Sequence, residues 1–171
     1  MENQYNIGDM VKINGVFGRI EKVTLRLTIL RDHEGIVHFI PNGQVSLVSN
    51  CTKEWSQARL YIGAAYHNPP EDVIQCLKRV GDELCVDPLY GGYVIECEVL
   101  GLERFDDSAV IYRVHIRVTA GDQWTIARIY QQRVMEAFTE EGIEIPFPQR
   151  VVHYATPDHI PTAENTGNNH S

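Results

Sequence analysis

The chain has no long apolar segment. Nowhere in its 171 residues is there a run that approaches the roughly 20 consecutive apolar residues that a helix needs to cross a bilayer. The first residues, Met1 to Tyr5, carry no basic start and no apolar stretch, so the sequence shows no signal peptide. As written, the chain is predicted to be soluble.

The chain also has no excess of positive charge. Its 15 basic and 23 acidic residues give a net charge of -8. Binding to a phosphate backbone depends on a basic surface, so we predict no nucleic-acid partner, and an anionic membrane surface is disfavoured for the same reason. The 43% hydrophobic and 22% charged content is typical of a globular protein with a buried core.

Motifs for metal binding and catalysis are missing from the sequence as well. The four cysteines contain no CxxC pair and the seven histidines no HExxH spacing, which favours reduced thiols and no metal. There is no GxSxG, no GxxxxGK[ST] and no GxGxxG. We therefore predict that the chain is not an enzyme, with no catalytic residue, no cofactor and no metal.

Residues 5–52 are predicted to form a small all-β domain. Apolar and polar residues alternate over 11–14, and Gly15 and Gly18 then bracket a turn. A long strand pattern rich in β-branched residues covers 20–30. Four or five strands with no helix indicate a small twisted sheet or an open, Sm-like barrel.

Two turns divide the rest of this domain. Asp32 to Gly35 is a polar turn that ends in glycine, and a short strand follows over 36–40. Pro41-Asn42-Gly43 then turns the chain, because Asn-Gly tolerates positive φ at both residues.

Residues 53–155 are predicted to form a second domain of mixed α and β structure. The expected elements, in order, are a strand at 58–64, a helix over 73–84, strands at 93–102 and 109–119, a helix over 126–138 and a short strand at 150–154. This βαββαβ order is that of a ferredoxin-like sandwich. The predicted fold class is therefore α+β, and residues 156–171 form a flexible polar tail.

The two helices have recognisable ends and faces. Asn68 is expected to cap the first helix, with the following prolines in or before its first turn. Val73, Leu77, Val80 and Leu84 recur with helical spacing and predict a buried face. In the second helix Gly142 is well placed as the terminating residue.

One face of the predicted sheet is charged. Glu96 and Glu98 alternate with the apolar residues Tyr93, Ile95, Cys97 and Val99, while Arg113, His115 and Arg117 alternate with valine, tyrosine and isoleucine on the next strand. If the hairpin brings the polar sides together, acids oppose bases. Two readings stay open: a solvated face with weak ion pairs, or a charged surface that lines something.

The fold itself does not decide the function. Ferredoxin-like domains include acylphosphate-cleaving enzymes and many RNA binders. An RNA-binding sheet needs exposed aromatics among basic residues, whereas Glu96 and Glu98 would repel phosphate.

The first 50 residues resemble the middle β-domain of the small-conductance mechanosensitive channel family. The matching positions include Gly8, Asp9, Gly15, Gly18, Arg26, Thr28, Arg31, Gly35 and Pro41-Asn42-Gly43, with Ile145 to Gln149 further along the chain. An ordered series of glycines and arginines is far more specific than a single short motif. The resemblance covers about residues 5 to 155.

This resemblance implies the cytoplasmic part of an inner-membrane channel that opens under tension and releases osmolytes and ions, without catalysis. It implies a homo-oligomer, a heptamer, whose ferredoxin-like domains enclose a vestibule, joined to the membrane by a pore helix upstream of Tyr5. The glycines at 8, 15 and 18 would permit close approach of strands or subunits. Arg26 and Arg31 would either pair with acids across an interface or serve the fold. The alternative is a stand-alone soluble module that binds a small ligand or nucleic acid.

Overall fold

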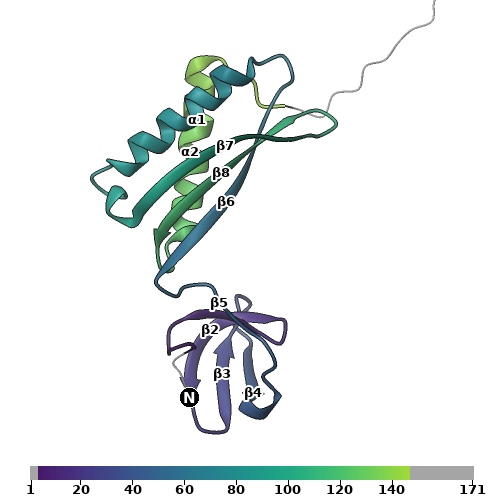
Figure 1. The fold of residues 1–171 in the computed structure, drawn as a ribbon, viewed down its shortest axis with the longest axis vertical. Helices are drawn as coiled ribbons and strands as arrows, with labels where there is room; N and C mark the ends of the chain where they lie inside the picture. The colour runs from purple at the N-terminus through teal and green to yellow at the C-terminus, as the bar shows by residue number, and fades with distance from the viewer. Residues whose placement is uncertain (1–3, 147–171) are drawn as a thin grey trace, which may run out of the picture.

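The computed structural model describes residues 4–146. They form two lobes joined by a short linker, with the β-only lobe at the N-terminal end (Figure 1). The predicted last strand at 150–154 and the polar tail at 156–171 lie outside the described residues.

The first lobe is a five-stranded antiparallel sheet in the order β4-β3-β2-β1-β5. Its elements are β1 (Met10–Ile13), β2 (Val16–Val23), β3 (Leu27–Arg31), β4 (Val37–Pro41), the 3-10 helix η1 (Asn42–Gln44) and β5 (Val48–Asn50). The buried apolar residues of this lobe are Val11, Ile13, Ile20, Leu30 and Ile40. The predicted all-β lobe is therefore present.

The predicted long strand over 20–30 is wrong, because the chain turns between β2 and β3. The turn contains no glycine or proline and is held by Thr24. Its backbone N–H donates to the Leu27 carbonyl at 2.8 Å, and its Oγ1 accepts the Leu27 N–H at 3.0 Å. Hydroxyl side chains that bond nearby backbone groups compete with a continuous strand.

The first hairpin is also placed differently from the prediction. Asn14 and Gly15 form its two-residue loop, with φ of 50° and 88°, which matches the positive φ that tight hairpin turns need. Gly18 lies inside β2 and not at a turn. Asn42-Gly43 does turn the chain, but within η1, and Gly43 does not adopt a positive φ.

The second lobe packs two helices on one face of a three-stranded antiparallel sheet with the order β6-β8-β7 (Figure 1). Its elements are β6 (Trp55–Ala64), α1 (Pro70–Cys85), the 3-10 helix η2 (Gly91–Tyr93), β7 (Val94–Phe105), β8 (Val110–Thr119) and α2 (Gln123–Glu141). The described part of the lobe therefore has βαββα order, and the chain has a mixed α+β fold.

The helices follow the periodicity of the sequence. The predicted stripe of α1 is fully buried, from Val73 to Leu84. Helix α2 ends at Gly142, which adopts the left-handed conformation with φ of 70°, as helix C-termini favour. The predicted cap of α1 is wrong: Pro69 occupies that position, and the Asn68 Nδ2 instead donates to the carbonyls of Ala65 and Glu144, both at 3.0 Å.

The two lobes touch at the linker. Ser56 Oγ donates to the Cys51 carbonyl at 2.9 Å and accepts the Gly121 N–H at 3.3 Å. Phe17 of β2 and Trp124 of α2 meet edge to face, with ring centroids 6.0 Å apart. Backbone, hydroxyl and aromatic contacts therefore all join the first lobe to the start of β6 and α2.

Candidate functional surface

The face of the second sheet that the helices leave uncovered carries the predicted charges. In the antiparallel register, Arg117 of β8 lies opposite both Gln57 of β6 and Glu96 of β7. The next row places His115 between Arg59 and Glu98. We refer to the side chains of these two rows, together with Arg113 and Glu103, as the charged face.

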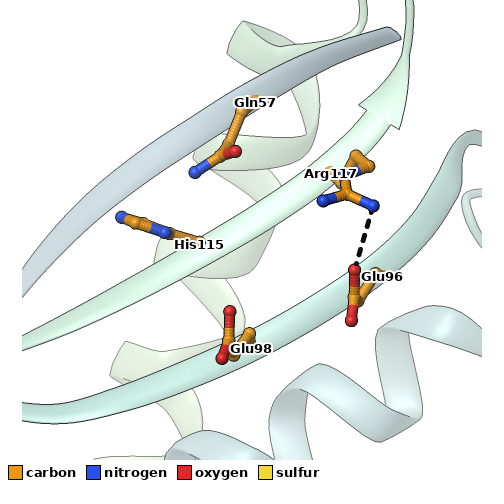
Figure 2. Close-up of a pocket in the computed structure, with 5 residues that line it drawn as sticks. All are labelled: Gln57, Glu96, Glu98, His115 and Arg117. Atoms are coloured by element: carbon orange, nitrogen blue, oxygen red, sulfur yellow. Dashed lines mark ion pairs between the residues drawn. The ribbon is translucent and has the colours of Figure 1, made fainter.

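Acids oppose bases on the charged face, as the alternation predicted. Arg117 Nη1 lies 3.3 Å from Glu96 Oε2, the pair joined in Figure 2, and Arg113 Nη1 lies 3.2 Å from Glu103 Oε1. The guanidinium of Arg117 also stacks over Trp55, 4.8 Å from the ring centroid. These pairs are partly exposed, so each contributes little to stability.

The charged face is close to electrically balanced when the histidine is neutral. Three arginines (Arg59, Arg113 and Arg117) share it with three glutamates (Glu96, Glu98 and Glu103). The net charge of -8 of the whole chain therefore resides elsewhere. That this face lines a vestibule stays a prediction.

His115 occupies the centre of the charged face. Its Nε2 is buried and has no hydrogen-bond partner among residues 4–146. A cavity of about 30 Å³ lies beside the ring, bounded also by Gln57, Glu96, Glu98 and Arg117 (Figure 2). Burial lowers the pKa of His115, and the charges of Arg113 and Arg59 lower it further, against a smaller opposing effect of nearby glutamates.

The inner side of β7 differs from the predicted alternation. A bulge between Val94 and Glu96 shifts the register, because one extra residue reverses the sides on which the preceding residues point. Val94 packs against the core together with Cys97 and Val99, whereas Tyr93 and Ile95 are about half exposed. The prediction that all four apolar residues share one side is wrong at Tyr93 and Ile95.

Several family-motif residues meet in one polar network in the first lobe. Thr28 is fully buried, and its Oγ1 donates to Asn42 Oδ1 at 2.9 Å and contacts the Tyr5 hydroxyl at 3.0 Å. Asn42 also donates its backbone N–H to the Arg26 carbonyl and its Nδ2 to the Thr24 carbonyl, both at 2.8 Å. The network fixes the turn after Pro41 against the start of β3.

Gly18 permits a close approach of two strands. A Cβ at this position would lie 2.5 Å from the Arg31 carbonyl oxygen and 2.6 Å from Leu30 Cδ1. Gly8 and Gly15 act differently: both adopt positive φ, and nothing lies within 4 Å of a Cβ built on either. Within this chain the expectation of close approach therefore holds for Gly18, whereas Gly8 and Gly15 serve turns.

Arg31 pairs with an acid of its own lobe. Its Nε donates to Glu21 Oε1 at 2.5 Å, and its Nη1 donates to the Gly35 carbonyl at 2.8 Å. The hydrogen bond from Arg31 lowers the pKa of Glu21. Gly35 adopts a φ of 85° in the turn between β3 and β4. The Arg26 side chain is exposed and forms no ion pair within residues 4–146.

Asp9 stabilises the entrance of the chain into β1. Its Oδ2 accepts hydrogen bonds from the Asn6 N–H at 2.9 Å and from Asn50 Nδ2 at 2.8 Å, and the second bond ties β5 to the first turn.

A groove of about 410 Å³ lies between the lobes. It is lined by Gly8, Asp9, Met10, Arg19, Thr52, Ala120, Gly121 and Trp124. No pattern in the sequence predicts this groove, because its residues come from four separate segments.

Two family profiles match the chain in order. The one described as "Mechanosensitive ion channel, beta-domain" covers residues 1–53, and the one described as "Mechanosensitive ion channel MscS, C-terminal" covers residues 58–145. The chain belongs to the MscS family of mechanosensitive ion channels. This is a family of channels and not of enzymes, in agreement with the sequence prediction.

MscS relatives occur in distant organisms. The small-conductance mechanosensitive channel of Caldanaerobacter subterraneus subsp. tengcongensis is 30% identical over 153 residues, which are 88% of this chain and 53% of that protein. An uncharacterized MscS family protein of Archaeoglobus fulgidus is 31% identical over 157 residues, 90% of this chain and 54% of that protein. The chain thus spans about half the length of these relatives.

Solved structures share the fold. Helicobacter pylori MscS in its closed state superposes with a TM-score of 0.74 at 20% identity, over 90% of this chain and 60% of that one. Arabidopsis thaliana MSL1 A320V superposes with a TM-score of 0.56 at 14% identity, over 85% of this chain and 56% of that one.

The described residues contain neither a membrane helix nor a metal cluster. No helix within residues 4–146 is long and apolar enough to cross a bilayer. In the same range no three His, Cys, Asp or Glu side chains come together as a metal site.

Proposed function

We propose that this chain is the cytoplasmic vestibule region of a mechanosensitive channel subunit. The observation that carries the proposal is the pair of family matches, which follow one another over residues 1–53 and 58–145. In the complete protein a pore helix would precede the first lobe. The relatives are nearly twice as long as the matched segment, which leaves room for membrane-spanning segments.

The assembly that we propose is a ring of identical subunits, a heptamer. The first lobes would pack side by side below the pore, and the second lobes would enclose a vestibule. Membrane tension would open the pore and release osmolytes and ions. The charged face is our candidate for the vestibule wall, because it is the polar side of a sheet whose other side is covered by α1 and α2.

The experiment is to reconstitute the full-length gene product into liposomes and record from excised patches under graded suction. We expect discrete current steps whose open probability rises with suction, at the same tension in patches of different diameter. Native mass spectrometry of the detergent-solubilised protein should give a mass of seven subunits. A protein that inserts but shows no tension-dependent current would overturn the channel role, and a different subunit number would overturn the heptamer alone.

The alternative of a stand-alone module is not supported by any observation within residues 4–146. The groove between the lobes has room for a small ligand, but two of its polar side chains already have partners within the fold: Asp9 binds Asn6 and Asn50, and Thr52 Oγ1 accepts the Met10 N–H at 3.0 Å. We therefore do not develop a second function.

A further inference from the structure

We propose that the pairing of the edge strand β7 with β8 depends on pH through His115. Protonation of the His115 ring in mild acid weakens this pairing. The proposal concerns the fold of this chain and does not depend on the channel role. The His115 ring lies at the centre of the charged face, and its neighbours come from all three strands of the sheet.

Basic and acidic side chains both surround His115. Arg59 lies opposite it on β6, and Arg113 and Arg117 lie two residues away on β8, on the same side of the strand. Glu98 is its direct partner on β7. The more distant acids, Glu96 and Glu103, are paired to Arg117 and Arg113. Arg113 and Arg59 would therefore repel a positive ring, and the carboxylates of Glu98 and Glu103 offset this repulsion only in part.

The hydrogen bonding of the ring also favours the neutral form. A neutral imidazole needs one donor and one acceptor contact, whereas an imidazolium has two N–H donors. Nε2 is buried and meets no acceptor among the described residues. A proton placed there would be a buried donor without a partner, which costs free energy. The ring can relieve this cost by moving toward Glu98 or into solvent.

Strand β7 is the element that would respond. It lies at the edge of the sheet, so β8 is its only hydrogen-bonded neighbour within the described residues. Bulges interrupt the pairing between Val94 and Glu96, between Val99 and Gly101 and between Leu102 and Arg104. The regular ladder between the first two bulges contains four pairs, one of which is Glu98 with His115. A change at His115 therefore affects a short segment of β7–β8 pairing that has a bulge at each end.

The direction of the pH effect follows from linkage. The pKa of His115 is lowered in the folded sheet from its ordinary value of 6.5, and a locally opened β7 would restore the ordinary value. The state in which β7 is paired with β8 is fully favoured above pH 6.5, and it loses this advantage as the pH falls toward the lowered pKa of His115. Each pH unit by which the pKa is lowered changes the opening equilibrium by about tenfold at low pH.

The first test is an NMR titration of the histidine rings in the 171-residue chain. We expect the midpoint of His115 to lie below its ordinary value of 6.5. The variant Glu98→Gln removes the opposing carboxylate and should lower the His115 midpoint further. A midpoint of His115 at or above 6.5 would overturn the proposal, and this test needs no variant at His115.

The second test is amide hydrogen exchange at pH 7.5 and pH 5.0, corrected for the intrinsic rates. In the wild type we expect the protection of residues 97–99 to fall at least about threefold at the lower pH, because protonation of His115 favours the unpaired strand. His115→Gln should abolish this fall, and the matched control His33→Gln should behave as the wild type. An equal loss of protection in wild type and His115→Gln would show that protonation of His115 does not weaken the pairing of β7 with β8.

Discussion

The first lobe buries five apolar side chains in its core, whereas the second buries twenty among the described residues. A small sheet cannot remove much apolar surface from water. It therefore depends more on the geometry of its turns and on buried hydrogen bonds, such as those of Thr28, Asn42 and Asp9. The second lobe relies on the packing of two amphipathic helices against a sheet.

This difference explains where the family motif lies. Residues that hold turns and polar networks must be particular residues, whereas a packed core accepts many apolar combinations of similar volume. The residues on which the predicted resemblance rests, among them Thr28, Arg31 and Asn42, lie mainly in the first lobe. The second lobe is recognised from its helical and strand periodicity. Substitutions in the two lobes should therefore destabilise the protein by different mechanisms.

The largest effect is expected in the core of the second lobe. Leu77 of α1 is fully buried, and Leu77→Ala should lower the free energy of unfolding of this lobe by about 2–5 kcal/mol, because it leaves a cavity. Urea unfolding followed by tryptophan fluorescence measures the change, since Trp55 and Trp124 belong to this lobe. The control Leu89→Ala, at a side chain 74% exposed, should stay within about 0.5 kcal/mol. Equal effects of the two variants would contradict the assigned core.

The next effect tests close packing of backbones in the first lobe. Gly18→Ala places a methyl group 2.5 Å from the Arg31 carbonyl, so β2 and β3 must separate, at a cost of about 1–3 kcal/mol. Amide signals of the two strands in a urea series report the loss. Gly43→Ala is the matched control, because its Cβ would meet nothing within 4 Å and its φ is not positive. If the control were as unstable as Gly18→Ala, the explanation by close approach would be wrong.

The sequence allowed a good prediction of what depends on regular periodicity. The buried face of α1, the end of α2 at Gly142 and the polar sides of the two strands that carry Glu96 and Arg117 follow from spacing, because a helix or strand repeats its side-chain directions. Which acid lies opposite which base depends on the register of the hairpin. The α+β fold class was predicted for the same reason.

The errors lie where one side chain overrides the repeat. Thr24 turns the chain inside a β-branched run, Asn68 binds Glu144 instead of capping α1, and a bulge sends Ile95 outward. Each depends on a partner or register that only the folded chain specifies. The surroundings of His115 were partly predictable from alternation, but the contribution of Arg59 required the pairing of β6 with β8.

A smaller effect is expected from the polar network of the first lobe. Thr28→Val keeps the shape but removes the hydroxyl that joins Tyr5 to Asn42. Asn42 Oδ1, in a partly buried bond, then loses its donor, which should cost about 0.5–1.5 kcal/mol, the net contribution of one hydrogen bond. Urea unfolding of the first lobe measures the loss. Thr139→Val is the control, because its hydroxyl bonds the Met135 carbonyl on an exposed helix surface. No difference between the two variants would mean that the buried network is not stabilising.

The smallest effect is a pH dependence of the turn between β3 and β4. Asp32 Oδ2 lies 2.7 Å from His38 Nε2, and Oδ1 accepts the N–H groups of Glu34 and Ile36. These contacts, the bond to His38 foremost, lower the pKa of Asp32 below its ordinary value of 3.8. The stabilisation is therefore present above pH 3.8 and is lost as the pH falls through the lowered pKa.

Asp32→Asn tests this effect against the polar networks that do not titrate. Because Asn keeps an acceptor oxygen but has no titrating carboxyl group, the urea midpoint of the first lobe should fall less between pH 6 and pH 3 in the variant than in the wild type. His38→Gln should weaken the dependence of the wild type without abolishing it, since the backbone donors remain. Identical pH profiles for wild type and Asp32→Asn would mean that the turn contributes no pH-dependent stability. The small lobe would then be stabilised by geometry and uncharged hydrogen bonds, while titration would act chiefly at His115 in the larger one.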